Sequence, residues 1–144
     1  MPTITSIGIA LGALSALLFI IADLYVILHM LQKIISPKTN WPRLQKIGKR
    51  WHNIHYYGNI ALVIVVVVHA ILMAPYTGFF NWLFFALICW MGTAGVLLKF
   101  SHLSPKSKAT ISRFHAQWYM ILFVLILLVI SHLLSLKYFP YPLG

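Results

Sequence analysis

Four long apolar segments, almost free of charge, constrain this chain more than any other feature. Residues 4–31 contain one charged side chain, and the segments 54–74, 78–98 and 114–136 contain none. A helix of about 20 apolar residues crosses the hydrocarbon core of a bilayer, so each segment is long enough to span it. Only 8% of the residues are charged, whereas a soluble domain carries about 25%. We therefore predict an all-α, integral membrane four-helix bundle.

Turn-forming residues set the expected boundaries of the helices. Pro37 and Pro105 should end the first and third helices, and Pro75 with Gly78 should form the short turn between the second and third, because proline disfavours helical backbone in the residue before it. The four segments leave little chain for a second folding unit, so residues 1–144 are expected to form a single transmembrane domain. The predicted helices cover about residues 4–32, 52–74, 79–100 and 110–138.

The net charge of +10 is explained by membrane topology. Six of the eleven basic residues lie in the connection 33–51, and four lie in the connection 99–113. Because cytoplasmic loops are enriched in lysine and arginine, both connections are predicted to be cytoplasmic, with both termini on the non-cytoplasmic side. We expect a bacterial or archaeal inner (plasma) membrane protein that contacts lipid and does not bind nucleic acid.

Histidines recur at matched depths on the second and fourth predicted helices. His69 and His132 lie deep in apolar sequence, and His55 and His115 lie near the cytoplasmic ends of the same helices. Ionisable side chains are costly at membrane depth and are usually functional. A haem iron takes one axial nitrogen from each side, so we predict that His55 with His115, and His69 with His132, hold two haems. The other ring nitrogen of each ligand should bond a carbonyl or a hydroxyl.

The spacing of the histidines fits one helix better than the other. His55 and His69 are fourteen residues apart, which places them about 21 Å apart along a helix and about 40° apart around it. His115 and His132 are seventeen residues apart, about 25 Å along the helix with an offset near 100°. A helix tilt, a π-bulge or ligation off-axis would have to absorb this difference. Alternatively, His52 replaces His55 as the ligand nearer the cytoplasm.

Other residues suit such a cofactor. Cys89 is the only cysteine, which excludes covalent attachment through a CxxCH motif and predicts non-covalent haem b. Gly58 would give a flat ring room between helices. Arg50 and Arg113 stand beside the cytoplasmic pair of histidines, where they would neutralise haem propionates.

Asp23 is the only acidic residue in the chain, and it lies within the first apolar segment, six residues before His29. A lone carboxylate at membrane depth is a candidate functional group. Asp23 and His29 are therefore a candidate quinone or proton site. The alternative is that Asp23 pairs with a basic group or hydrogen-bonds a neighbouring helix.

The segment His55-Tyr-Tyr-Gly58 followed by His69-Ala-Ile-Leu resembles the His-x-x-Gly…His helix of membrane di-haem b-type cytochromes. The likeness is to ferric-reductase-like transmembrane domains, cytochrome b561 and nitrate reductase gamma-type subunits. Arg113-Phe-His115…His132 resembles their second ligand helix, and Gly92-Thr-Ala-Gly95 resembles the glycine segment between, so the resemblance covers about residues 50–136. It implies two b haems and electron transfer across the membrane.

The spacing of the second pair of histidines is longer than is usual in ferric reductases, and the chain carries no flavin or nicotinamide domain. We therefore expect an electron-transfer subunit of a larger oxidoreductase rather than a complete enzyme, exchanging electrons with quinone or a peripheral redox partner. Two alternatives stay open. A (bacterio)chlorophyll-binding subunit would need only single histidines, and a small non-redox transporter or assembly protein would bind no chromophore.

Overall fold

The computed structural model describes residues 4–36 and 41–138. These residues are helical almost throughout, with short connections and no strand among them. The elements in chain order are α1 (Ile4–Ile35), α2 (Pro42–Met73), the single 3₁₀ turn η1 (Ala74–Tyr76), α3 (Phe79–Phe100), α4 (Pro105–His115) and α5 (Trp118–Tyr138).

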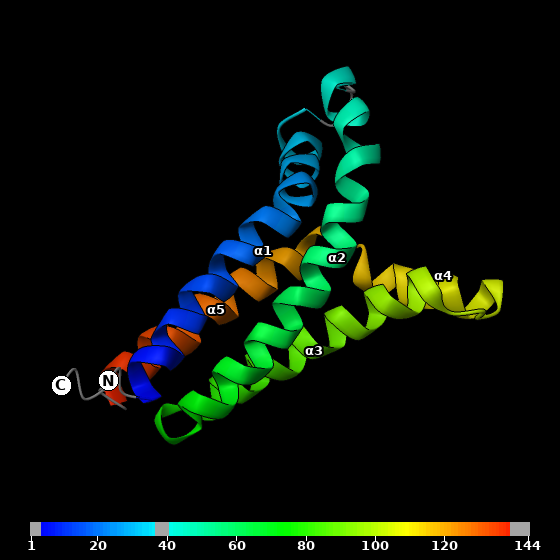
Figure 1. Ribbon diagram of the computed structural model, residues 1–144. Coiled ribbons are helices and arrows are strands. Elements are labelled where there is room, and N and C mark those ends of the chain that lie inside the picture. The colour runs from blue at the N-terminus through cyan, green and yellow to red at the C-terminus, as the bar shows by residue number, and fades with distance from the viewer. Residues whose placement is uncertain (1–3, 37–40, 139–144) are drawn as a thin grey trace.

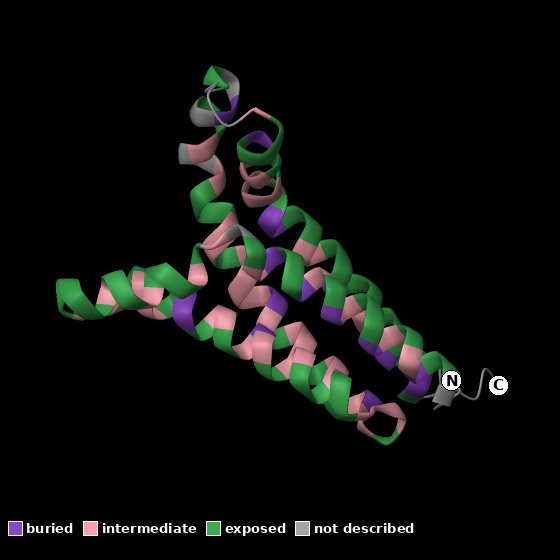
Figure 2. Cartoon of the chain, turned by 180° about the vertical axis from the view of Figure 1, so that it is seen from behind, coloured by how far each residue is buried: buried purple, intermediate pink, exposed green. Residues whose placement is uncertain are grey.

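Within the described residues, four helical segments are long and apolar enough to cross a membrane: Ile4–Ile35, Trp51–Tyr76, Phe79–Phe100 and Tyr119–Lys137. The prediction of an all-α fold with four such helices is confirmed. The outside of the bundle is apolar, because large side chains such as Ile71, Ile64 and Leu133 are 67%, 61% and 61% exposed. Exposed residues recur along every helix in Figure 2. This surface is compatible with contact with lipid.

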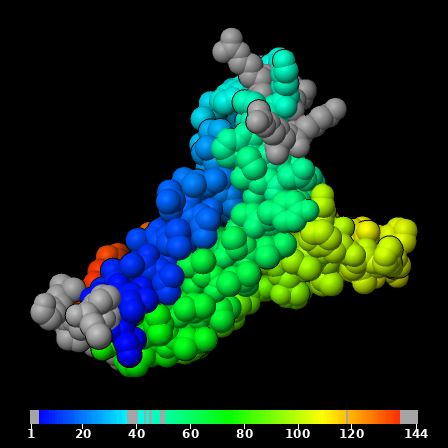
Figure 3. Space-filling view, in the orientation of Figure 1, coloured from blue at the N-terminus to red at the C-terminus, as the bar shows by residue number. Residues whose placement is uncertain are grey.

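The contact between α1 and α2 is the most extensive in the bundle, and α3 packs against both α5 and α2. α1 and α2 run antiparallel and pack together along most of their length, and α5 packs against α3. Figure 1 shows two arms that diverge from the body at one end: the C-terminal part of α1 with the N-terminal part of α2, and the end of α3 with α4. The second arm projects clearly in the space-filling view of Figure 3. Both termini of the described chain lie at the opposite end.

Small residues bring α1 and α2 into close contact. A Cβ atom added to Gly58 would lie 2.8 Å from the Cβ of Ala22, and Ala22 has no exposed surface. Small residues at such crossings let two helix backbones approach closely. Gly58 was expected to make room for a cofactor. Instead, the space beside it is filled by α1.

Helix α2 begins ten residues earlier than the predicted start at 52, and α1 ends at Ile35 rather than at 32. Proline is favoured in the first turn of a helix, where its missing N–H leaves no hydrogen bond unmade, and Pro42 occupies that position in α2. The residues after it, from 43 to 51, have no glycine or proline except Gly48. Most of the connection predicted at 33–51 is therefore helical.

The single helix predicted at 110–138 is wrong, because the chain forms two helices with a break at Ala116 and Gln117. α4 starts at Pro105 because the Ser104 hydroxyl accepts a hydrogen bond from the Ser107 N–H at 3.2 Å and caps the helix. α4 is polar and basic, whereas α5 is apolar. The break coincides with this change in polarity, and α4 turns away from α5 (Figure 1).

Candidate cofactor cavities

Two cavities lie end to end between the α1–α2 pair and the α3–α5 pair. The first has a volume of about 590 Å³, and its lining includes His69 and His132. The second has a volume of about 440 Å³, and its lining includes His55 and His115. We call them the His69 cavity and the His55 cavity. Each cavity thus has in its lining both members of one of the histidine pairs expected from the sequence.

A single apolar layer separates the two cavities. Four side chains line both of them, and each comes from a different long helix. Leu62 lies midway in sequence between His55 and His69, and it is only 3% exposed. Because the same four side chains line both cavities, groups bound in the two cavities would contact this layer from either side. The shared side chains are Phe19, Leu62, Ile88 and Val124.

His69 is held from α2 against the facing helix α1. Its Nδ1 lies 2.7 Å from the carbonyl oxygen of Gly8. A carbonyl oxygen only accepts, so the Nδ1–H of His69 donates this hydrogen bond and the lone pair remains on Nε2. An imidazole that ligates a metal is oriented in the same way, with its second N–H bonded to a carbonyl.

The ring of His69 depends on a glycine in α1. A Cβ atom added at Gly12 would lie 2.8 Å from the Cε1 of His69 and 3.2 Å from its Nδ1. The Gly12→Val substitution is therefore expected to displace the ring and break its hydrogen bond to Gly8. Loss of a contact that orients a ligand weakens metal affinity by about 10–100-fold. With a haem in each cavity, Gly12→Val would lower the haem content of the purified protein from two per chain towards one, as measured by pyridine haemochrome.

The matched control for this substitution is Ala10→Val, because Ala10 lies on the same helix and is exposed. It adds the same side chain without facing His69, and it should retain full haem content. Equal haem content in both variants would show that the contact between Gly12 and His69 does not support a cofactor.

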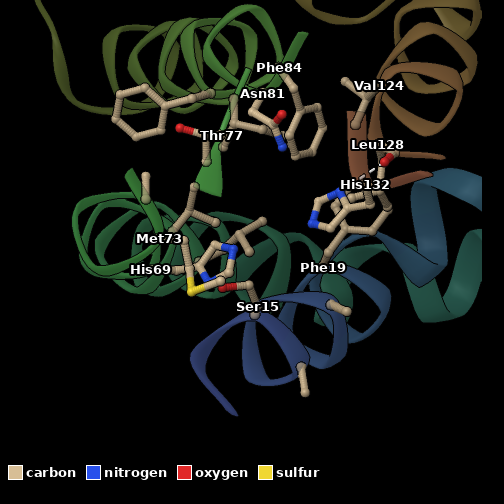
Figure 4. Close-up of a pocket in the computed structure, with 18 of the residues that line it drawn as sticks. Ser15, Phe19, His69, Met73, Thr77, Asn81, Phe84, Val124, Leu128 and His132 are labelled. Atoms are coloured by element: carbon tan, nitrogen blue, oxygen red, sulfur yellow. Dashed lines mark hydrogen bonds between the residues drawn. The ribbon is translucent and has the colours of Figure 1, made fainter. Parts of the chain in front are cut away.

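His132 enters the same cavity from α5 (Figure 4). Its Nδ1 lies 2.9 Å from the carbonyl oxygen of Leu128, one turn earlier in α5. The Nδ1–H therefore donates, and Nε2 again keeps the lone pair. The ring also makes an edge-to-face contact with Phe84 of α3, with 6.3 Å between centroids. Both histidines of this cavity are thus fixed in the tautomer that a metal ligand needs.

His55 is bound by the only carboxylate in the chain. Its Nδ1 lies 2.9 Å from Oδ1 of Asp23 on α1. The amide of Asn59 donates to the same carboxylate at 3.2 Å and to the carbonyl of His55 at 2.8 Å. A carboxylate only accepts, so the Nδ1–H of His55 donates to it and Nε2 is free. Asp23 thus forms hydrogen bonds with the neighbouring helix α2.

His115 faces His55 across the second cavity from the C-terminus of α4. The two ring centroids are 6.3 Å apart. Two imidazoles that share one metal ion, with metal–nitrogen bonds of about 2 Å, have centroids roughly 6 Å apart. The Nδ1 of His115 is buried without a hydrogen-bond partner among the described residues. Buried polar atoms rarely lack a partner, so this nitrogen is available to a group bound in the cavity.

Burial lowers the pKa of His115, the nearby His55 lowers it further, and Asp23 acts in the opposite direction. The net effect favours the neutral ring. A neutral imidazole is the form that binds a metal, so His115 is available as a ligand at neutral pH.

The remaining candidate residues differ in whether they line a cavity and in how exposed they are. His52 and His29 both line the His55 cavity. His52 is exposed and its ring packs edge-on against Tyr56, with 4.7 Å between centroids, whereas His55 is the ring that faces His115. Arg113 is exposed on α4. The side chain of Arg50 lies outside the described residues.

Sequence reasoning overlooked three contributors to these sites: Gly8, Gly12 and Asn59. Gly8 and Gly12 form a small-xxx-small pattern, which marks close helix contacts. Asn59 lies one turn after His55, which is the spacing of side-chain neighbours on a helix. These signals were present, but only the pairing of α1 with α2 shows which histidine each residue contacts.

The chemistry of the cavities favours a planar metal complex over a bare metal ion. Within the ranges that the structure describes, no three histidine, cysteine or acidic side chains lie together as a metal-ion cage requires. The His69 cavity instead offers two imidazoles and a mostly apolar wall. The His55 cavity is lined by four histidines, of which His55 and His115 face each other. Haem supplies four equatorial nitrogens of its own and takes only the two axial ligands from the protein. The residues present therefore fit a haem in each cavity.

Comparison with known proteins identifies no relative: no family model, no curated protein and no solved structure matches this chain.

Proposed function

We propose that this protein is a membrane b-type cytochrome that carries electrons across the bilayer through two bis-histidine haems. The observation that supports it most strongly is the placement of one histidine pair in each of two adjoining cavities. In three of the four rings, Nδ1 is hydrogen-bonded within the protein, which leaves Nε2 as the free nitrogen.

His69 with His132, and His55 with His115, would provide the axial ligands, and each bound haem would supply a reversible one-electron couple. The chain itself performs the other tasks. Gly8, Leu128 and Asp23 orient the ligand rings, and apolar side chains form most of the wall of the His69 cavity. The shared layer around Leu62 borders both sites, and this adjacency suits electron transfer between them.

The proposed orientation places the His55 cavity towards the cytoplasm. This cavity lies at the end of the bundle where the two arms diverge, and those arms contain the basic connections. Cytoplasmic segments are enriched in lysine and arginine. His29 and Lys33 line the same cavity, so we propose that quinone or a peripheral redox partner exchanges electrons at this end. The protein would act as an electron-transfer subunit of a larger oxidoreductase.

Transmembrane electron transfer is tested directly in proteoliposomes. The purified holoprotein is reconstituted into vesicles that contain trapped ferricyanide, and a membrane-impermeant reductant is added outside. We expect the trapped ferricyanide to be reduced in vesicles that contain the protein. A rate equal to that of protein-free vesicles would contradict the proposal, even if haem is bound.

A further inference from the structure

The two cavities differ in the groups that accept a hydrogen bond from the Nδ1–H of their histidines. His69 and His132 donate to neutral backbone carbonyls, whereas His55 donates to the carboxylate of Asp23 at 2.9 Å. A carboxylate is the stronger acceptor, and it draws the Nδ1 proton away from the ring more than a carbonyl does. An imidazole bonded in this way is a more basic metal ligand.

The side chain of Asp23 is buried and held in place by hydrogen bonds. Its side chain is 9% exposed, and the Asn59 amide donates to the same oxygen that accepts from His55. The described groups that face Asp23 are thus His55 and Asn59 on α2. His115 of α4 is close enough to interact electrostatically with the carboxylate. No other acidic residue exists in the chain, so the His69 cavity has no counterpart to this carboxylate.

We propose that Asp23 is a positioning residue that gives the haem of the His55 cavity the lower reduction potential of the two. This inference rests on the proposed function. A more basic axial ligand and a buried negative charge nearby both favour the more positively charged, oxidised iron, because hydrogen bonding to the ligand and local charge set the potential. Electrons would then run downhill from the His55 site to the His69 site, away from the end that carries the basic arms.

The test is a redox titration of the full-length holoprotein, followed by its haem absorption bands. Asp23→Asn keeps the size and an acceptor oxygen but removes the charge. We expect one haem to shift to a higher potential and the other to stay unchanged, with two haems still bound per chain. The electron paramagnetic resonance signal of the shifted, oxidised haem should change as well, because the strength of its axial ligand has changed. Asp23→Glu, which restores a carboxylate, should return the potential towards that of the wild type.

Variants that lack one histidine ligand identify the cavity whose haem changes its reduction potential. In a His132→Ala background only the haem of the His55 cavity should remain, and Asp23→Asn should still raise its potential. In a His115→Ala background the remaining haem should not respond. Ser135→Ala is the matched control, because it removes a buried hydrogen bond, from Ser135 to Asn81 at 2.9 Å, in another part of the bundle. It should leave the potential of the His55 site unchanged.

Two outcomes would overturn the inference: both haems unmoved by Asp23→Asn, or both moved equally. If Asp23→Asn released the haem, variants that keep Asp23 would still test the inference. The haem retained in His132→Ala must then titrate at a lower potential than the haem retained in His115→Ala, and the reverse order would refute the inference. These results differ from failure of the proposed function, in which the wild-type protein would bind no haem or would leave ferricyanide trapped in vesicles unreduced.

Discussion

His132→Ala is expected to remove one of two haems and to leave the other in place. The substitution deletes the imidazole that α5 contributes to the His69 cavity, where its Nδ1 is already committed to Leu128 at 2.9 Å. The opposite ligand, His69, comes from α2, and a single axial bond holds haem far less firmly than two. Haem content by pyridine haemochrome should fall to half, and the low-spin signal of one haem should disappear.

His102→Ala is the matched control for this experiment. His102 is exposed in the connection between α3 and α4, so its loss should leave both haems bound. A His132→Ala protein with full haem content would show that the His69 cavity does not use this ligand. Loss of pigment from His69→Ala and His132→Ala independently, with a magnesium tetrapyrrole extracted, would support the chlorophyll alternative.

His55→Ala is expected to remove the other haem, whereas His52→Ala should retain both. The sequence leaves these two histidines as alternatives, and the geometry separates them. His55 faces His115 with 6.3 Å between ring centroids and is held by Asp23, whereas His52 is exposed and packs against Tyr56. Haemochrome quantitation of the two purified variants provides the measurement. The opposite result, with haem lost only from His52→Ala, would transfer the ligand role to His52.

The structure explains how His115 and His132, seventeen residues apart, are accommodated. A continuous helix would place His115 and His132 about 100° apart in direction, and the sequence suggested a tilt or a π-bulge as the remedy. In the structure the chain breaks at Ala116 and Gln117, so the two rings belong to different helices and need not share one face. Neither residue breaks helices on its own, which explains why the sequence did not predict the break.

The four spanning helices were predictable because hydrophobic length is a property of local sequence. The residues that orient the histidines were not. Asp23 lies far from His55 in the chain. Their contact depends on the register between α1 and α2, which the packing of Gly58 against Ala22 helps to set. The Gly12 contact with His69 depends on the same register. Such contacts follow from tertiary packing, which periodicity alone does not determine.

The stoichiometry of haem to polypeptide tests the central claim most directly. The full-length protein is purified from membranes of a haem-producing host, its reduced-minus-oxidised spectrum is recorded, and its haem is quantified as pyridine haemochrome. Two b haems per chain is the result that the paired cavities predict. Protein that is folded, purified from such membranes and free of haem would contradict the cytochrome proposal and favour a non-redox membrane protein.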